Sequence, residues 1–82
     1  MLEIFVIKRC NFCKKAIKLV HEYNIRHRII NVLDEDKDEI KRINNMTTFP
    51  MIFYNIREKE RIRIGGYSDF EELVRKGIEK KS

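Results

Sequence analysis

The sequence predicts an α/β fold in which helices cover a four-stranded mixed sheet, in the order β-α-β-α-β-β-α. In residues 1–45, short apolar segments alternate with stretches whose apolar residues recur every three to four positions, as strands and amphipathic helices do. In residues 51–64, two strand-like segments follow each other across a short polar turn, which favours an antiparallel hairpin. Strands joined through a helix run parallel, so this order predicts a sheet with both kinds of pairing.

The first strand is expected over residues 3–7, an apolar run that leads into Cys10. The helix after it has apolar residues at i, i+3, i+4 and i+7 and lysines on the opposite face. These apolar positions are Cys13, Ala16, Ile17 and Val20. We expect the helix to end at Asn24, because asparagine tolerates the left-handed conformation that follows many helix ends.

A second strand is expected over residues 27–33, which are rich in β-branched side chains. Asp34 is the expected N-cap of the next helix, since its carboxylate can accept hydrogen bonds from the free amides of the first turn. Ile40 and Ile43 give this helix an apolar stripe, and it is expected to end near residues 44–45.

Two further strands are expected over residues 51–56 and 60–64, joined by a polar turn at residues 57–59. The second of these strands alternates charged and apolar residues, as a half-buried strand does. Ser68 begins a capping-box sequence with Glu71, which predicts the start of the last helix. The apolar face of that helix contains Phe70, Leu73, Val74 and Ile78.

The chain has 82 residues and is expected to form one domain over residues 1–82, with 43% apolar and 38% charged residues and no low-complexity linker. No apolar stretch is long enough to cross a bilayer and no signal peptide is visible, so no membrane association is expected. Two cysteines are too few for a secreted disulfide framework, which favours a reducing compartment. We therefore expect a soluble, cytoplasmic monomer.

The net charge of +5 is concentrated in residues 1–31, which hold seven Lys or Arg and two Glu. Such an excess is consistent with an ordinary solvated surface. It also favours electrostatic attraction of an anionic substrate. Nucleic acid is not expected as a partner, because the aromatic residues are not interleaved with the basic ones.

The only cysteines, Cys10 and Cys13, stand where the first strand turns into a helix, which is typical of a thiol–disulfide redox site. The first amides of a helix have no partner within it and its N-terminal end is positive, so a thiolate at Cys10 is favoured over a thiol. Four nearby cations add to this effect: Lys8, Arg9, Lys14 and Lys15. One helical turn later, Cys13 is within reach of any mixed disulfide that Cys10 forms.

Three separated motifs resemble those of glutaredoxins: the CxxC pair, TTFP at residues 47–50, and GGYSD at residues 65–69. They stand in the family's order, and the resemblance covers essentially the whole chain. It implies the thioredoxin-like glutaredoxin fold and a glutathione-dependent thiol–disulfide oxidoreductase that reduces protein disulfides and glutathione mixed disulfides. In this resemblance Cys10 corresponds to the family's nucleophile and Cys13 to its resolving thiol.

The resemblance also implies a glutathione site that begins at the TTFP motif. Pro50 resembles the family's cis-proline, and an X–Pro bond is the one place where a cis peptide is cheap. The backbone of Phe49, which follows Thr48, would then pair with the cysteinyl part of glutathione. Phe12 would either form a lid over the substrate or simply cover the disulfide.

The two ends of glutathione are assigned by the same resemblance. Ser68 and Asp69 would receive the γ-glutamyl end, because free helix amides suit its carboxylate and Asp69 suits its ammonium. Lys8, with Arg9 as the alternate, would attract the glycyl carboxylate.

Three residues depart from the common family pattern. Asn11 stands where the commonest CxxC motif has proline, and Phe12 replaces the usual tyrosine. Met46 stands where many glutaredoxins have an arginine that helps to hold the glycyl carboxylate. Lys41 or Arg42 would have to supply that charge here.

Two alternatives for the CxxC pair stay open. One is a redoxin coupled to thioredoxin reductase, without a glutathione site. The other is a carrier of a glutathione-ligated iron–sulfur cluster, which the absence of the motif proline leaves possible. A zinc site with His21 and His27 is not expected, because the spacing C-x2-C-x7-H-x5-H matches no common zinc pattern. We therefore expect glutathione as co-substrate, disulfide-containing proteins as partners, and no metal.

Overall fold

The computed structural model describes residues 1–57 and 60–81, and the side chains among these up to residue 77. The elements are β1 (Leu2–Val6), α1 (Asn11–Glu22), β2 (His27–Asn31), α2 (Lys37–Asn44), β3 (Met51–Arg57), β4 (Glu60–Gly65) and α3 (Tyr67–Lys81). The strands form one sheet in the order β2-β1-β3-β4. β1 pairs in parallel with β2, whereas β3 is antiparallel to both β1 and β4, so the predicted mixed α/β sheet is confirmed.

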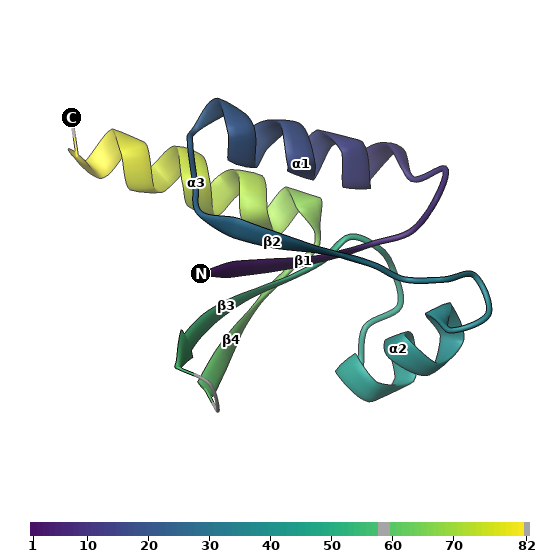
Figure 1. Cartoon of the computed structure of the whole chain (residues 1–82). Coiled ribbons are helices and arrows are strands. Elements are labelled where there is room, and N and C mark those ends of the chain that lie inside the picture. The colour runs from purple at the N-terminus through teal and green to yellow at the C-terminus, as the bar shows by residue number, and fades with distance from the viewer. Residues whose placement is uncertain (58–59, 82) are drawn as a thin grey trace.

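The helices cover the two faces of this sheet unequally. α1 and α3 lie side by side on one face, and α2 lies beyond the other face, at the end of the sheet where α1 begins (Figure 1). Leu2, Ile4 and Val6 alternate along β1 and are all buried, because β1 is a central strand. Glu3 is the one buried charged residue among those described, and it forms an ion pair with Arg28 of the neighbouring β2.

The ends of α1 and of the first two strands differ slightly from the prediction. β1 begins and ends one residue earlier than expected, and β2 ends at Asn31 rather than at residue 33. α1 ends at Glu22, but Asn24 has a φ of 53°, so it adopts the left-handed conformation expected after the helix. Asn45 closes α2 in the same way, with a φ of 52°.

The predicted start of α2 at Asp34 is wrong. The helix begins at Lys37, and Asp36 is its N-cap residue, although its carboxylate makes no capping hydrogen bond. Residues 33–36 instead form a turn, in which the Asp36 amide donates to the Leu33 carbonyl at 2.9 Å. The predicted apolar stripe is also narrower than expected, because Ile40 is half-buried but Ile43 is exposed.

The predicted capping box at Ser68 is also wrong. α3 begins at Tyr67, so Ser68 lies inside the first turn and Gly66 precedes the helix. The Gly66 amide donates to the Asp69 carboxylate at 3.3 Å. This is one of the two hydrogen bonds of a capping box, and it joins residues 66 and 69 instead of the predicted residues 68 and 71. An acidic residue in this first turn is favourable because the helix N-terminus is positive.

The hairpin of β3 and β4 matches the two predicted strands closely. The alternation of exposed and buried side chains in β4 is less complete than expected, because Ile62 remains 52% exposed. Residues 58 and 59 of the predicted turn lie outside the described residues, as does the side chain of Ile78 on the predicted apolar face of α3. Among the helices of the described residues, none has both the length and the apolar character of a membrane span.

Candidate active site

The start of α1 is built around the sulfur of Cys10. Cys10 is the N-cap residue, with extended backbone angles (φ −112°, ψ 106°), and its Sγ accepts a hydrogen bond from the Cys13 amide at 3.1 Å. Its carbonyl oxygen accepts from the Lys14 amide at 3.2 Å. The preceding Arg9 has a φ of 56°, so the chain turns sharply between β1 and the helix. The sulfur therefore occupies the place at which a helix N-terminus binds an anion.

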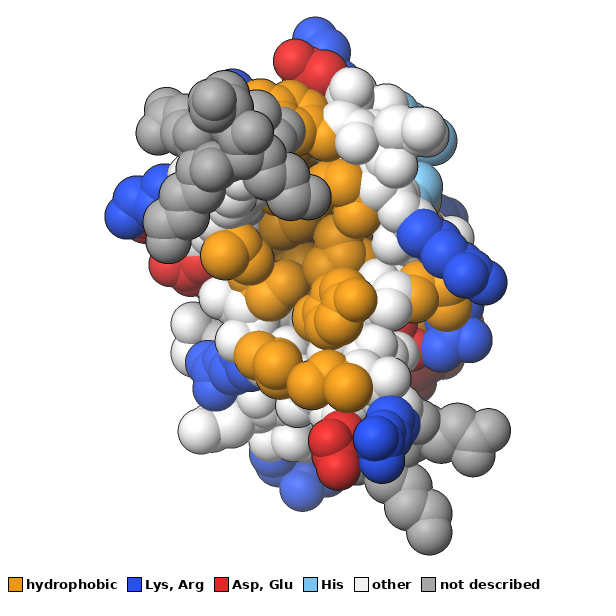
Figure 2. Space-filling model, turned by 90° about the vertical axis from the view of Figure 1, so that its left-hand side faces the viewer, with side chains coloured by type: hydrophobic (Ala, Val, Ile, Leu, Met, Phe, Trp, Pro, Cys, Tyr) orange, Lys and Arg blue, Asp and Glu red, His pale blue; other side chains and the backbone are white. Residues whose placement is uncertain are grey.

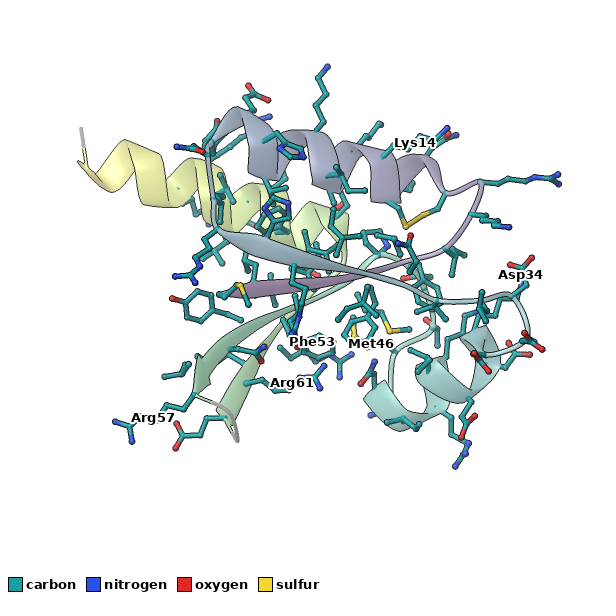
Figure 3. The ribbon with its side chains drawn as sticks, viewed as in Figure 1. Lys14, Asp34, Met46, Phe53, Arg57 and Arg61 are labelled. Carbon is teal, nitrogen blue, oxygen red and sulfur yellow. A yellow bond between two sulfur atoms is a disulfide. The ribbon has the colours of Figure 1, made fainter. Side chains whose placement is uncertain are left out.

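Cys10 and Cys13 form a disulfide, with their Cα atoms 5.2 Å apart. The two residues differ in exposure, since Cys13 is buried with 2% of its surface accessible and Cys10 is only partly buried. Figure 3 shows this disulfide as a yellow bond at the start of α1, with Lys14 on the side of the helix away from the sheet. Cys10 is thus the sulfur that an incoming molecule can reach.

The segment before β3 faces the disulfide. The Phe49–Pro50 peptide bond is cis, and the Phe49 carbonyl oxygen lies 3.6 Å from Cys10 Sγ. Pro50 is fully buried, which fixes the segment against the core. Phe49 precedes the first paired residue of β3, which is Met51 opposite Phe5, so its backbone is not part of the sheet pairing.

The loop between β4 and α3 depends on Gly65 for its shape. Gly65 has a φ of +119°, and a Cβ atom at this position would collide with the carboxylate of Asp69. Glycine therefore allows Asp69 to fold back over the loop and accept the hydrogen bond from Gly66. This local packing fixes the first turn of α3, in which the Tyr67 ring lies beside that of Phe12.

These segments surround a hollow of about 330 Å³ beside the disulfide. Its lining contains six of the residues predicted to contact glutathione, namely Phe12, Thr48, Phe49, Pro50, Ser68 and Asp69, together with Gly66 and Tyr67. The two other predicted contacts, Lys8 and Arg9, are exposed on the turn before α1 and do not line the hollow. The structure therefore brings together the predicted contacts from the start of α1, the segment before β3 and the start of α3. It does not bring Lys8 and Arg9 into the hollow.

Phe12 is placed at the mouth of this hollow. Its side chain is 53% exposed, and its ring centroid lies 5.9 Å from that of Tyr67. The Lys15 ammonium lies 5.0 Å from the same ring centroid, within the range of a cation–π interaction. Phe12 thus connects the cysteine motif of α1 to the first residue of α3.

Tyr67 belongs to the GGYSD motif and lines the hollow, although the sequence did not predict it to contact glutathione. Its hydroxyl donates to Glu71 at 3.0 Å, and Arg75 donates both to Glu71 and to the Tyr23 hydroxyl, each at 3.1 Å. Burial, together with the hydrogen bond to Glu71, raises the pKa of Tyr67. Tyr67 therefore retains its proton. α3 is joined to the end of α1 by the hydrogen bond from Arg75 to Tyr23, and Tyr67 contacts α1 through the ring of Phe12. In the sequence, its position directly before the predicted contact Ser68 could have indicated that it lines the hollow.

The proposed replacement for the missing family arginine is not found in the hollow. Met46 is buried and packs in the core, as its interior position in Figure 3 shows. Arg42 is exposed on α2, where its nearest carboxylate is Glu39 at 4.0 Å, and neither it nor Lys41 lines the hollow. Met46 thus serves packing rather than charge.

Three comparisons with known proteins all find glutaredoxins. The family model for glutaredoxins matches residues 2–58. Glutaredoxin-1 of Vaccinia virus (strain Copenhagen) is 28% identical over 78 residues, covering 85% of this chain and 68% of the viral protein, and Glutaredoxin-1 of Ectromelia virus (strain Moscow) gives the same values. The solution structure of glutaredoxin from Brucella melitensis matches the fold with a TM-score of 0.71 at 22% identity, covering 98% of this chain and 84% of the other.

Gly65→Ala should displace the Asp69 carboxylate and destabilise the protein by about 1–3 kcal/mol, because the position combines a left-handed φ with a steric collision. The matched control is Gly77→Ala, where an added Cβ meets no atom within 4 Å and should stabilise α3 by about 0.5–1 kcal/mol. Urea denaturation measures both. Equal effects of the two substitutions would contradict the assigned role of Gly65.

Proposed function

Because the chain belongs to the glutaredoxin family, we propose that it is a thiol–disulfide oxidoreductase with glutathione as its reductant. The observation that carries this proposal is the placement of Cys10. Its sulfur caps a helix and lies 3.6 Å from the carbonyl oxygen of Phe49, which lines the hollow, and Cys10 is less buried than Cys13. A reactive thiolate needs such a partly exposed, electropositive site, whereas the resolving thiol can remain buried until the mixed disulfide forms.

The proposed reaction starts from the dithiol form. The Cys10 thiolate attacks one sulfur of a substrate disulfide, the substrate S–S bond breaks, and the other substrate sulfur leaves as a thiolate that takes up a proton. The resulting mixed disulfide is resolved by Cys13, which releases the reduced substrate and forms the disulfide between Cys10 and Cys13. Two glutathione molecules then return this disulfide to the dithiol and leave as glutathione disulfide. Each step is an exchange whose rate depends on the thiolate fraction and on the leaving thiol.

We propose that glutathione occupies the hollow of about 330 Å³. The backbone of Phe49 lies beside Cys10 and outside the sheet pairing, which supports strand-like pairing with the cysteinyl part of the peptide. The first turn of α3 supports binding of the γ-glutamyl end, since Ser68 and Asp69 are exposed there and line the hollow. Lys8 and Arg9 are long and exposed, so they are proposed to approach the glycyl carboxylate from the rim.

The proposed cellular setting follows from the same chemistry. The cycle needs a compartment that keeps glutathione reduced, and we propose the cytoplasm. Glutathione and disulfide-containing proteins are the proposed partners, and a monomer is sufficient because every proposed contact comes from one chain.

Cys13→Ser should retain reduction of glutathione mixed disulfides and lose most reduction of protein disulfides. Only Cys13 can resolve a mixed disulfide within the molecule, whereas glutathione can replace it when the mixed disulfide contains glutathione. The two activities are measured side by side with a glutathionylated peptide and a disulfide-bonded protein. Equal losses would show that Cys13 has a different role.

Asp69→Asn should raise the glutathione concentration needed for half-maximal turnover about tenfold. The reason is the loss of a charge-assisted hydrogen bond to the ligand ammonium, which contributes roughly 1.5–3 kcal/mol. Asparagine preserves an acceptor for the Gly66 amide, so the loop should stay folded. The measurement is the glutathione dependence of disulfide reduction.

The matched control for this charge change is Asp34→Asn, which removes an exposed carboxylate outside the hollow and should leave the dependence unchanged. If Asp69→Asn has no effect in a folded protein, the γ-glutamyl assignment is wrong. If the oxidised protein is reduced by thioredoxin reductase and not by glutathione, the coupled redoxin replaces the proposed function.

A further inference from the structure

The outer edge of the hairpin is separate from the redox site. β4 pairs only with β3 among the described strands and is the last strand of the sheet on that side. An edge strand presents unpaired amide and carbonyl groups that can pair with another extended chain. The pairing of β3 and β4 is regular where residues 53–55 face residues 61–63, and the register shifts on both sides of this stretch. The regular part of the outer edge is therefore residues 61–63.

The face of this edge towards α3 is apolar. Beside Ile62 lies a hollow of about 480 Å³ whose lining is entirely hydrophobic or aromatic and includes Tyr54 and Leu73. Ile62 is 52% exposed and Leu73 is 55% exposed, although both border the core. Figure 2 looks onto this end of the molecule, where hydrophobic side chains gather around the hollow. Apolar surface that is exposed and contiguous in this way is typical of an interaction site.

The opposite face of the same edge is cationic. Arg61 and Arg63 are two positions apart in β4, so they share this face. The Arg61 guanidinium lies 4.0 Å from the ring centroid of Phe53, and Figure 3 shows the two side chains together. This stacking holds the guanidinium in place, and Arg61 forms no ion pair with a carboxylate of the described residues.

A second hollow, of about 410 Å³, lies beside Arg61 on this face. It is lined by three arginines (Arg28, Arg57 and Arg61), Asn55 and a single carboxylate, Glu3. Glu3 is already paired with Arg28, so the lining keeps a positive excess. Burial raises the pKa of Glu3, but hydrogen bonds from Arg28 and Asn55 and the charges of Arg28 and Arg61 outweigh it and lower the pKa overall. Glu3 therefore stays ionised and cannot serve an incoming acid as a donor.

We propose that β4 is a docking edge for an extended segment of a partner protein in which apolar and acidic residues alternate. Side chains of a strand added beside β4 would point alternately to the two faces. Those on one face would meet the apolar hollow beside Ile62, and those on the other would meet Arg61 and Arg63. The backbone pairing gives affinity, and the alternating side chains give specificity.

The same arginines disfavour a second copy of this chain on the edge. A two-fold pairing of two β4 strands keeps Arg61 and Arg63 of both copies on one face of the joined sheet. Like charges opposite each other across a strand pair are destabilising. The charge of β4 thus disfavours pairing with a second β4 strand and favours pairing with an acidic strand.

The test uses the full chain labelled with ¹⁵N and an octapeptide that alternates glutamate and valine. Backbone NMR shifts should saturate with peptide at residues 61–63 and at Leu73. Two control peptides should bind several-fold more weakly: one with the same residues in two blocks, and one with lysine in place of glutamate.

Arg63→Glu provides the matched variant, because this exposed side chain lies on the cationic face and outside both hollows. It should weaken binding of the glutamate peptide and strengthen binding of the lysine peptide, each several-fold, whereas Arg42→Glu on α2 should change neither. Leu73→Asn should weaken both alternating peptides.

The proposal is wrong if the three peptides bind equally, or if the shifts fall outside β4 and its hollows. Shifts at residues 61–63 that grow with protein concentration in the absence of peptide would assign the edge to a second copy instead. Peptide binding does not involve the cysteines, so the result is independent of the proposed reductase activity.

Discussion

The hydrogen bond from the Cys13 amide to the Cys10 sulfur, 3.1 Å long, fixes the junction between β1 and α1. A helix needs acceptors for its first amides, and here sulfur takes the place that a serine or aspartate oxygen usually has. Because β1 is a central strand and Ile4 within it is fully buried, the sheet core determines where the helix can begin. Fold and reactivity are therefore linked, since one atom both caps the helix and carries the proposed chemistry.

The strand directions explain why distant motifs meet at this junction. β1 runs towards Cys10, so the antiparallel β3 begins at the same end of the sheet, directly after Pro50. β4 is antiparallel to β3 and ends there at Gly65, which pairs with Ile52. Hydrophobic periodicity predicted the order of strands and helices, but not that β3 pairs antiparallel with β1. That the three motifs meet was implied by the resemblance to glutaredoxins, and in the structure residues of all three segments line the hollow beside the disulfide.

The sequence could not predict features that depend on competition between neighbouring residues. Asp34 and Asp36 are both acceptable helix caps, and the turn after β2 decides in favour of Asp36. Ser68 has the better capping side chain, yet α3 starts before it because Gly65 and Gly66 let Asp69 close the loop. Likewise, alternation identified β4 as a strand but did not indicate that its outer edge would remain uncovered.

The central claim is that the helix start favours the Cys10 thiolate, and the rate of alkylation by iodoacetamide as a function of pH tests it most directly. The Cys13→Ser protein leaves one reactive sulfur and preserves the amide at position 13. In the folded protein we expect a midpoint below about 7.5, and in the same protein unfolded in urea a return to about 8.5, the pKa of an ordinary thiol. Coincident midpoints near 8.5 in both states would contradict the account.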